Sequence, residues 1–91
     1  MTLNEVWSRI CRLQGAIFKT VKGHSFDYIV DGNGLFIFRD GRLINRRLTL
    51  TDVLNAAERC PLETTTEIAD CLGPSYLFGI LMDPRVRSGL W

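Results

Sequence analysis

Apolar residues recur at helical spacing near the start of the chain and alternate with polar ones further on. Residues 3–14 place their large apolar side chains on one helix face. Thr2 and Glu5 form a capping box before them. Three to four strands follow, and the turns between them are too short for parallel crossovers. The predicted strands are residues 16–21, 26–30, 35–39 and 42–48.

The sequence after the last predicted strand again favours helices. Thr49 and Asp52 have the spacing of a helix cap and its N3 partner, and Pro61 ends that helix. A short helix is predicted at 67–72 and a further one at 74–82, ended by Asp83-Pro84. The predicted class is α+β: an N-terminal helix, a three- to four-stranded antiparallel meander, and two to three C-terminal helices packed on one sheet face. Residues 1–91 form one small globular domain.

Composition narrows the class of protein. The chain is 46% hydrophobic, enough for one core, and no apolar run approaches the roughly 18 residues of a membrane span. We therefore expect a cytoplasmic protein with no membrane partner. Cys11, Cys60 and Cys71 are predicted to be buried thiols, because their number is odd and none forms a CxxC pair. With a single histidine, neither a metal site nor a cofactor is predicted.

Charge is distributed unevenly along the chain. Residues 1–48 hold eight Lys/Arg against four Asp/Glu, a balance of +4, and residues 49–91 hold three against six, a balance of −3. Such polarity can steer an anionic partner to one end of the molecule. It can equally favour head-to-tail association of two copies.

Four arginines lie within nine residues of the predicted hairpin. Guanidinium groups bind phosphate and carboxylate in bidentate fashion, so this cluster is a candidate nucleic-acid or anion contact. The opposing interpretation is a solvated edge hairpin whose charges prevent edge-to-edge pairing. Strand alternation also sends the last two arginines to opposite faces. The candidate contacts are Arg39, Arg42, Arg46, Arg47, Lys19 and Lys22.

The last long helix is apolar on all sides. It follows an acidic segment and lacks basic groups at its start, which argues against a DNA-recognition helix and favours a core helix or an interface. The candidate interface residues are Tyr76, Phe78, Met82 and Trp91. His24, next to Gly23, could act as a general base or as a phosphate contact. The favoured interpretation is a surface turn residue, because no partner for catalysis lies at readable spacing. No catalytic residue is predicted.

Three segments together resemble a small uncharacterised bacterial domain. They are Lys22-Gly-His-Ser-Phe-Asp-Tyr28-Ile-Val, Arg47-Leu-Thr-Leu-Thr-Asp52-Val-Leu-Asn-Ala56, and Gly73-Pro-Ser-Tyr76 followed by Asp83-Pro-Arg85. The resemblance covers about residues 16–87. It implies a bacterial source, in some cases mobile DNA, and it implies no activity.

Three functions follow from these observations. The favoured one is a non-enzymatic interaction module that self-associates, as a dimer for example, or binds a protein partner, because a small domain gains stability by burying surface. The alternative is a nucleic-acid- or phosphate-contacting module that uses the basic hairpin. A small enzyme is the third, less favoured, because no arranged nucleophile, base or metal set is visible.

Overall fold

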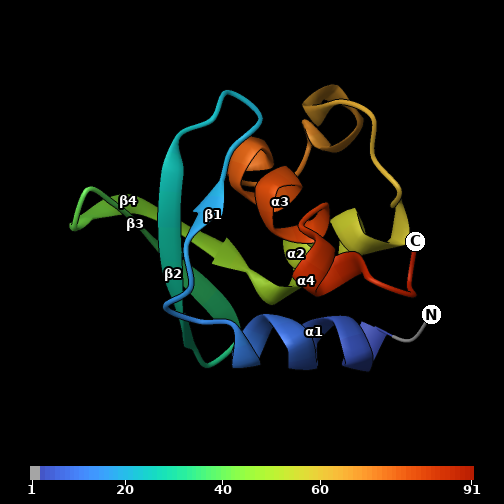
Figure 1. Cartoon of the computed structure of the whole chain (residues 1–91), viewed down its shortest axis with the longest axis horizontal. Helices are drawn as coiled ribbons and strands as arrows, with labels where there is room; N and C mark the ends of the chain where they lie inside the picture. The colour runs from blue at the N-terminus through green and yellow to red at the C-terminus, as the bar shows by residue number, and fades with distance from the viewer. Residues whose placement is uncertain (1–2) are drawn as a thin grey trace.

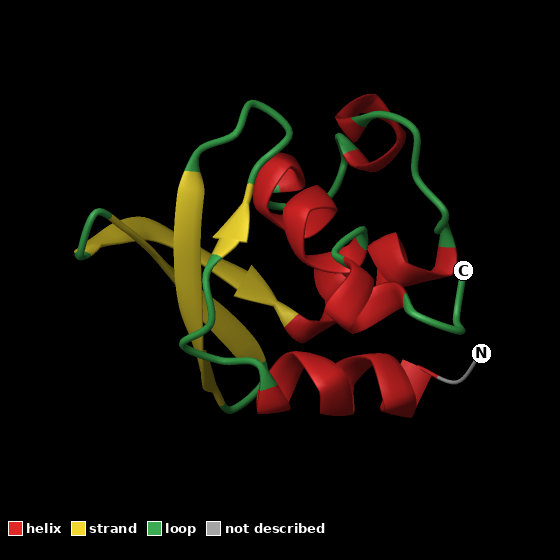
Figure 2. Ribbon diagram, in the orientation of Figure 1, coloured by secondary structure: helices red, strands yellow, loops and turns green. Residues whose placement is uncertain are grey.

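A four-stranded antiparallel sheet carries all the helices on one of its faces (Figures 1 and 2). The computed structural model describes residues 3–91, apart from the side chains of Asn45 and Arg46. This arrangement confirms the predicted α+β class. The elements are α1 (Leu3–Arg12), β1 (Phe18–Lys19), β2 (Ser25–Asp31), β3 (Gly34–Arg39), β4 (Arg42–Thr49), α2 (Leu50–Glu58), the 3₁₀ helix η1 (Thr65–Ile68), α3 (Pro74–Leu81) and α4 (Pro84–Arg87).

The strands follow one another in chain order, as a meander should. In β3, Leu35 and Ile37 face the helices and are fully buried, whereas Phe36 and Phe38 lie on the opposite face. The β3–β4 register shifts between Phe36 and Phe38, so β4 carries a bulge there. Across the shift β4 has two more residues than β3. Because two is an even number, side chains on both sides of the bulge still alternate between the same two faces of the sheet.

The core lies between the sheet and the helices. Phe18, Phe26 and Tyr28 form an aromatic cluster on the inner face, with Phe18 and Tyr28 ring centroids 5.3 Å apart. The buried Tyr28 hydroxyl donates a 2.6 Å hydrogen bond to the Ile10 carbonyl of α1. This bond fixes the N-terminal helix against the sheet. The proposed Thr2 cap of α1 lies outside the described residues.

Strand β1 is shorter than predicted: two residues instead of six. The Thr20 hydroxyl accepts a hydrogen bond from the His24 backbone nitrogen (3.1 Å), in the place where a strand carbonyl would continue the ladder. The Thr20 backbone nitrogen still donates to the His24 carbonyl at 2.9 Å. A tight loop therefore replaces the end of the predicted strand, and its residues become available to form a site.

The segment predicted as a helix over 67–72 is instead a single 3₁₀ turn, Thr65–Ile68. Arg59 binds the Glu67 carbonyl at 3.1 Å, and the Leu72 backbone nitrogen donates to the Asp52 carboxylate at 3.1 Å. Both backbone groups are thus taken by side chains outside the segment. Asp52 is consequently not the reciprocal partner of Thr49, although Thr49 caps α2 as predicted.

Asp83 and Pro84 start a further short helix as well as ending α3. The Asp83 side chain caps α4 by accepting from the Arg85 backbone nitrogen at 2.8 Å. Behind α4, the Trp91 indole donates to the Leu81 carbonyl at 3.0 Å, which docks the C-terminal tail. Tyr76, Phe78, Met82 and Trp91 all pack partly buried against the core, so their role in an interface stays a prediction.

No helix within residues 3–91 has the length and apolar character needed to cross a bilayer. The cysteines are free; Cys71 is buried, while Cys11 and Cys60 are half-buried. Burial raises the pKa of all three thiols above the ordinary value for cysteine. The thiols therefore remain protonated and weakly nucleophilic at neutral pH. In this state they pack like small hydrophobic side chains.

Candidate functional site: a basic pocket at the start of α3

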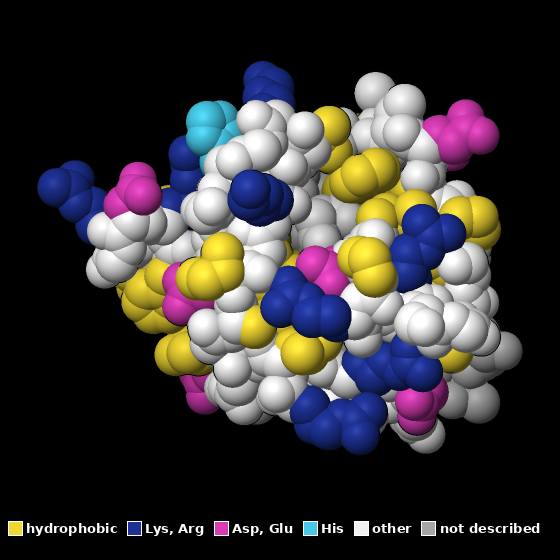
Figure 3. All heavy atoms as spheres, viewed as in Figure 1, with side chains coloured by type: hydrophobic (Ala, Val, Ile, Leu, Met, Phe, Trp, Pro, Cys, Tyr) yellow, Lys and Arg dark blue, Asp and Glu magenta, His cyan; other side chains and the backbone are white. Residues whose placement is uncertain are grey.

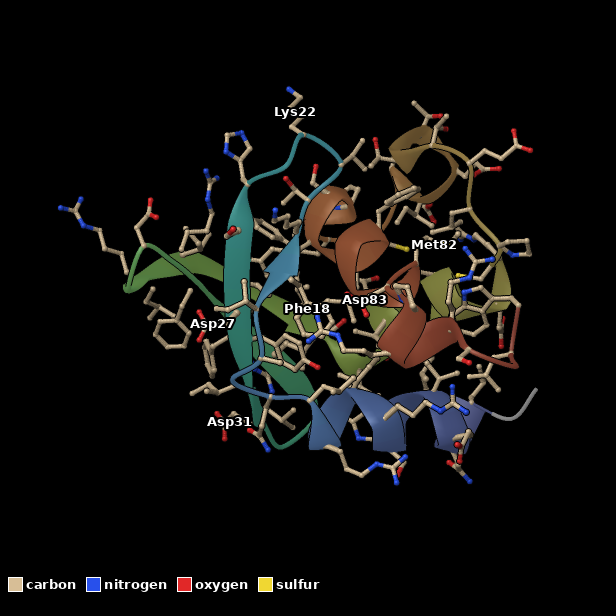
Figure 4. All side chains as sticks on the ribbon, viewed as in Figure 1. Phe18, Lys22, Asp27, Asp31, Met82 and Asp83 are labelled. Atoms are coloured by element: carbon tan, nitrogen blue, oxygen red, sulfur yellow. The ribbon has the colours of Figure 1, made fainter. Side chains whose placement is uncertain are left out.

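The loop between β1 and β2 brings two basic side chains to the top of the sheet. Gly23 adopts a left-handed conformation (φ +86°) and donates to the Thr20 carbonyl at 2.9 Å. Together with the two Thr20–His24 bonds, this locks the loop and fixes the positions of Lys22 and His24. Lys22 extends to solvent from the loop tip (Figure 4).

Arg39 reaches the same region from the end of β3. Its side chain lies on the helix-covered face of the sheet and is half-buried. One guanidinium nitrogen lies 3.4 Å from the hydroxyl of Tyr76 in α3. Tyr76 is held in turn by an edge-on contact with Phe26, with centroids 5.1 Å apart. Strand and helix therefore orient the guanidinium together.

The start of α3 supplies further hydrogen-bonding groups. Gly73 takes up the left-handed conformation (φ +66°) that turns the chain into the helix, and Pro74 occupies the first turn. A Cβ on Gly73 would lie 2.4 Å from the Leu48 side chain, so glycine is required there on two grounds. Ser75 follows on the surface, in the turn where helix N–H groups have no intrahelical acceptor.

These three segments enclose a cavity of about 260 Å³, which we call the basic pocket. Each lining side chain can donate a hydrogen bond, and none is acidic. In Figure 3 the histidine (cyan) lies between basic side chains (dark blue) at the upper left of the molecule. No described carboxylate forms an ion pair with the two permanent cations of the pocket. The lining residues are Thr20, Lys22, His24, Arg39, Ser75 and Tyr76.

The structure separates the six predicted anion contacts. Arg39 and Lys22 meet in the basic pocket. Arg42 is exposed at the hairpin tip, and Arg47 lies over the Phe36 ring on the uncovered sheet face. Lys19 lines a different groove. The Arg46 side chain lies outside the described residues. Sequence reasoning did not place His24 and Ser75 beside Arg39, because these residues are distant from one another in the chain.

A second and larger cavity, of about 390 Å³, lies between β1 and α3. Ile17, Val21, Phe78 and Met82 give it apolar walls, and Figure 4 shows Phe18, Met82 and Asp83 beside it. Its floor depends on Gly79, because a Cβ there would lie 2.4 Å from the Lys19 carbonyl oxygen. The helix therefore contacts the strand backbone directly.

The carboxylate of Asp83, which lines this groove, is paired with Arg85. The Asp83 carboxylate accepts two side-chain hydrogen bonds from Arg85, both 2.9 Å long. These bonds hold the pKa of Asp83 below its ordinary range. Arg85 also stacks on Phe18 at 4.4 Å and donates to the Ile17 carbonyl at 2.7 Å. The pair fastens α4 to β1, which is a structural task, so we assign the chemistry to the basic pocket.

Comparison of the chain with protein families, with characterised proteins and with solved structures gave no match. The resemblance to an uncharacterised bacterial domain therefore stays a prediction. Its motifs now have positions in the fold, however. Lys22 to His24 and Gly73 to Tyr76 meet at the basic pocket.

Proposed function

We propose that the protein binds a phosphate-type oxyanion in the basic pocket. The observation that carries this proposal is the convergence of Lys22, His24 and Arg39 on a cavity lined also by three hydroxyl groups. A phosphoryl group offers only acceptor oxygens at neutral pH, which complements a lining made of donors. The planar guanidinium of Arg39 can bind two phosphoryl oxygens at once.

Binding of an oxyanion would require little reorganisation of the side chains that line the basic pocket. Arg39 is half-buried and rests on Tyr76, so much of its side-chain freedom is already lost in the free protein. The loop that carries His24 is fixed by three hydrogen bonds within itself. Lys22 at the rim would add long-range attraction and little geometric selectivity. The +4 balance of residues 1–48 reinforces that attraction.

A phosphate group can come from a nucleic-acid backbone or from a small phosphorylated molecule. Both present the same oxygens to Arg39 and His24. They differ in the surface they cover, because a nucleic acid would extend beyond the pocket toward Arg42 or Lys19. Nucleic-acid affinity would also fall steeply with salt, since each contacted phosphate releases counterions.

Arg39→Gln tests the proposal, with Arg42→Gln as its matched control. Both arginines flank the same hairpin turn, but only Arg39 lines the pocket. We expect Arg39→Gln to weaken binding of inorganic phosphate by roughly 10-fold or more, since a hydrogen bond to a charged group contributes about 1.5–3 kcal/mol. Arg42→Gln should leave the affinity nearly unchanged. Calorimetric titration with sodium phosphate at constant ionic strength provides the measurement.

A parallel titration with a single-stranded oligonucleotide distinguishes the two sources. Tight, salt-dependent binding that Arg42→Gln also weakens would identify a nucleic-acid backbone. Binding of phosphate alone would identify a small phosphorylated ligand. Equal losses in the two variants, or no binding of phosphate by the wild-type protein, would refute the basic pocket as the site.

A further inference from the structure

Three cavities follow one another along β1, the edge strand of the sheet. The basic pocket and the groove between β1 and α3 share Thr20 as a lining residue. Beyond the groove, Arg85 donates to the carbonyl of Ile17, a groove residue, and itself lines a third cavity of about 170 Å³. The three cavities form one continuous path, which we call the β1 track. The third cavity, called the arginine pocket, is lined by Arg9, Arg12, Leu13 and Arg85.

Positive charge predominates along the β1 track. Among the described residues that line it, Asp83 is the one acid, and its carboxylate is bound by Arg85. Glu5 is paired with Arg9 of the arginine pocket at 3.1 Å. In Figure 3, basic side chains (dark blue) recur from the loop at the top of this face down to α1 at the bottom. The cations of the track are Lys22, Arg39, Lys19, Arg85, Arg9 and Arg12.

Arg85 provides a flat surface near the middle of the track. Its guanidinium lies 4.4 Å from the centre of the Phe18 ring and is held by hydrogen bonds to the Asp83 carboxylate and the Ile17 carbonyl. One face of the guanidinium therefore rests on Phe18, while the side chain is still 43% exposed. Nucleobases stack on arginine planes of this kind in single-strand recognition. The orientation of Arg85 is already fixed, so little side-chain freedom is lost on binding.

A path with cations at both ends and a stacking surface between them fits a nucleic-acid strand. We infer that the β1 track binds single-stranded nucleic acid, with a base on Arg85 and neighbouring phosphates at Lys19 and Arg12. The inference rests on the proposed phosphate site and extends it to a strand that leaves the basic pocket past Lys19. Neither Lys19 nor Arg12 forms an ion pair with an acid that the structure describes, so both charges are available to phosphate.

The stacking surface distinguishes this ligand from other polyanions. A run of acidic side chains would satisfy the cations of the track but would leave the outer face of Arg85 unused. In a duplex the bases stack on one another, so their faces are not offered to a side chain. A single strand presents both its phosphates and its base faces, which is the combination that the track can bind.

Fluorescence anisotropy with a labelled thymidine oligonucleotide of about 12 nucleotides, within the range of single-strand sites, tests the inference. Arg12→Gln and Lys19→Gln should each weaken the affinity roughly 3- to 10-fold at low salt. Each should also lower the slope of log affinity against log salt by about 0.7, the value for one single-strand phosphate. Arg47→Gln is the matched control, because Arg47 is exposed over Phe36 on the opposite sheet face. It should bind like the wild type.

The role of the base is measured with an abasic strand of equal length. The wild-type protein should bind that strand more weakly than the thymidine strand, by roughly 5-fold or more. Arg85→Lys keeps the charge but removes the plane, so it should reduce this difference. Equal affinities of the wild type for the two strands would overturn the inference. Poly-glutamate of equal charge that binds as tightly as the thymidine strand would overturn it as well, and would indicate an acidic protein partner.

A titration with inorganic phosphate separates this inference from the proposed function. Arg12→Gln and Lys19→Gln should bind phosphate like the wild type, because neither residue lines the basic pocket. A wild-type protein that binds phosphate through Arg39 but does not bind the oligonucleotide would overturn the track and leave the phosphate site standing. Oligonucleotide binding that Arg47→Gln weakens as much as Arg12→Gln would also overturn the track. Absence of binding to both ligands would overturn both proposals.

Discussion

Gly79→Ala is expected to destabilise the protein by about 1–2 kcal/mol, because the cost of overpacking against rigid backbone, about 2–3 kcal/mol, exceeds the gain in helix propensity. Gly79 lies inside α3, where alanine would ordinarily stabilise a helix by about 1 kcal/mol. Here the new Cβ would lie 2.4 Å from the Lys19 carbonyl oxygen and 3.1 Å from the Phe26 ring. Neither neighbour can yield easily, since one is strand backbone and the other is core.

Urea unfolding followed by circular dichroism measures this effect. A loss of this size is a large part of the roughly 5–15 kcal/mol by which domains are stable. The sign alone is decisive: a more stable alanine variant would mean that α3 does not touch β1. The variant should also lose phosphate affinity if it folds, because the displacement of α3 moves Ser75 and Tyr76 away from Arg39.

The second large effect concerns alkaline pH. Burial, with a smaller contribution from nearby Cys11, raises the pKa of Tyr28 well above its ordinary value. Because the pKa of Tyr28 is higher in the folded state than in the unfolded state, its neutral hydroxyl contributes to the free energy of unfolding. That contribution is fully present at any pH below the unfolded-state pKa of about 10. That contribution disappears as the pH rises through 10 toward the folded-state pKa. We therefore expect wild-type stability to fall steeply above about pH 10.

Tyr28→Phe isolates this contribution. At neutral pH the variant should be about 1–2 kcal/mol less stable, because the Ile10 carbonyl loses its buried donor. Above pH 10 its stability should fall less than that of the wild type, so the two curves converge. Unfolding free energies measured from pH 7 to 11 provide the comparison. Parallel curves over that interval would contradict a buried, neutral Tyr28.

Local signals in the sequence predicted most of the fold. Alternation in β3 separated Leu35 and Ile37 from Phe36 and Phe38, and Thr49 and Gly73 marked the helix boundaries where the structure has them. The error over residues 67–72 arose where side chains from outside that segment replaced local hydrogen bonds. Arg59 and Asp52 hold the segment predicted as a third helix, and neither interaction has a signature in local sequence.

The candidate site was less predictable for the same reason. The hairpin arginines are neighbours in sequence, and the fold distributes the described ones among the basic pocket, the hairpin tip and the sheet face opposite the helices. Arg39 joins His24 and Ser75, which are 15 and 36 residues away by their numbering. Only the pairing of β2 with β3 and the packing of α3 bring them together. Proximity of this kind is tertiary, so counting basic residues in a window cannot find it.

The most direct test of the phosphate site is a residue-resolved titration. Amide chemical shifts of the ¹⁵N-labelled protein are followed as inorganic phosphate replaces chloride at constant ionic strength. The largest changes should fall on His24, Ser75 and Tyr76, with saturation, and Arg39→Gln should suppress them. Changes centred on the hairpin tip at Asp40-Gly41, or changes that rise without saturation across the basic surface, would contradict a phosphate site in the basic pocket.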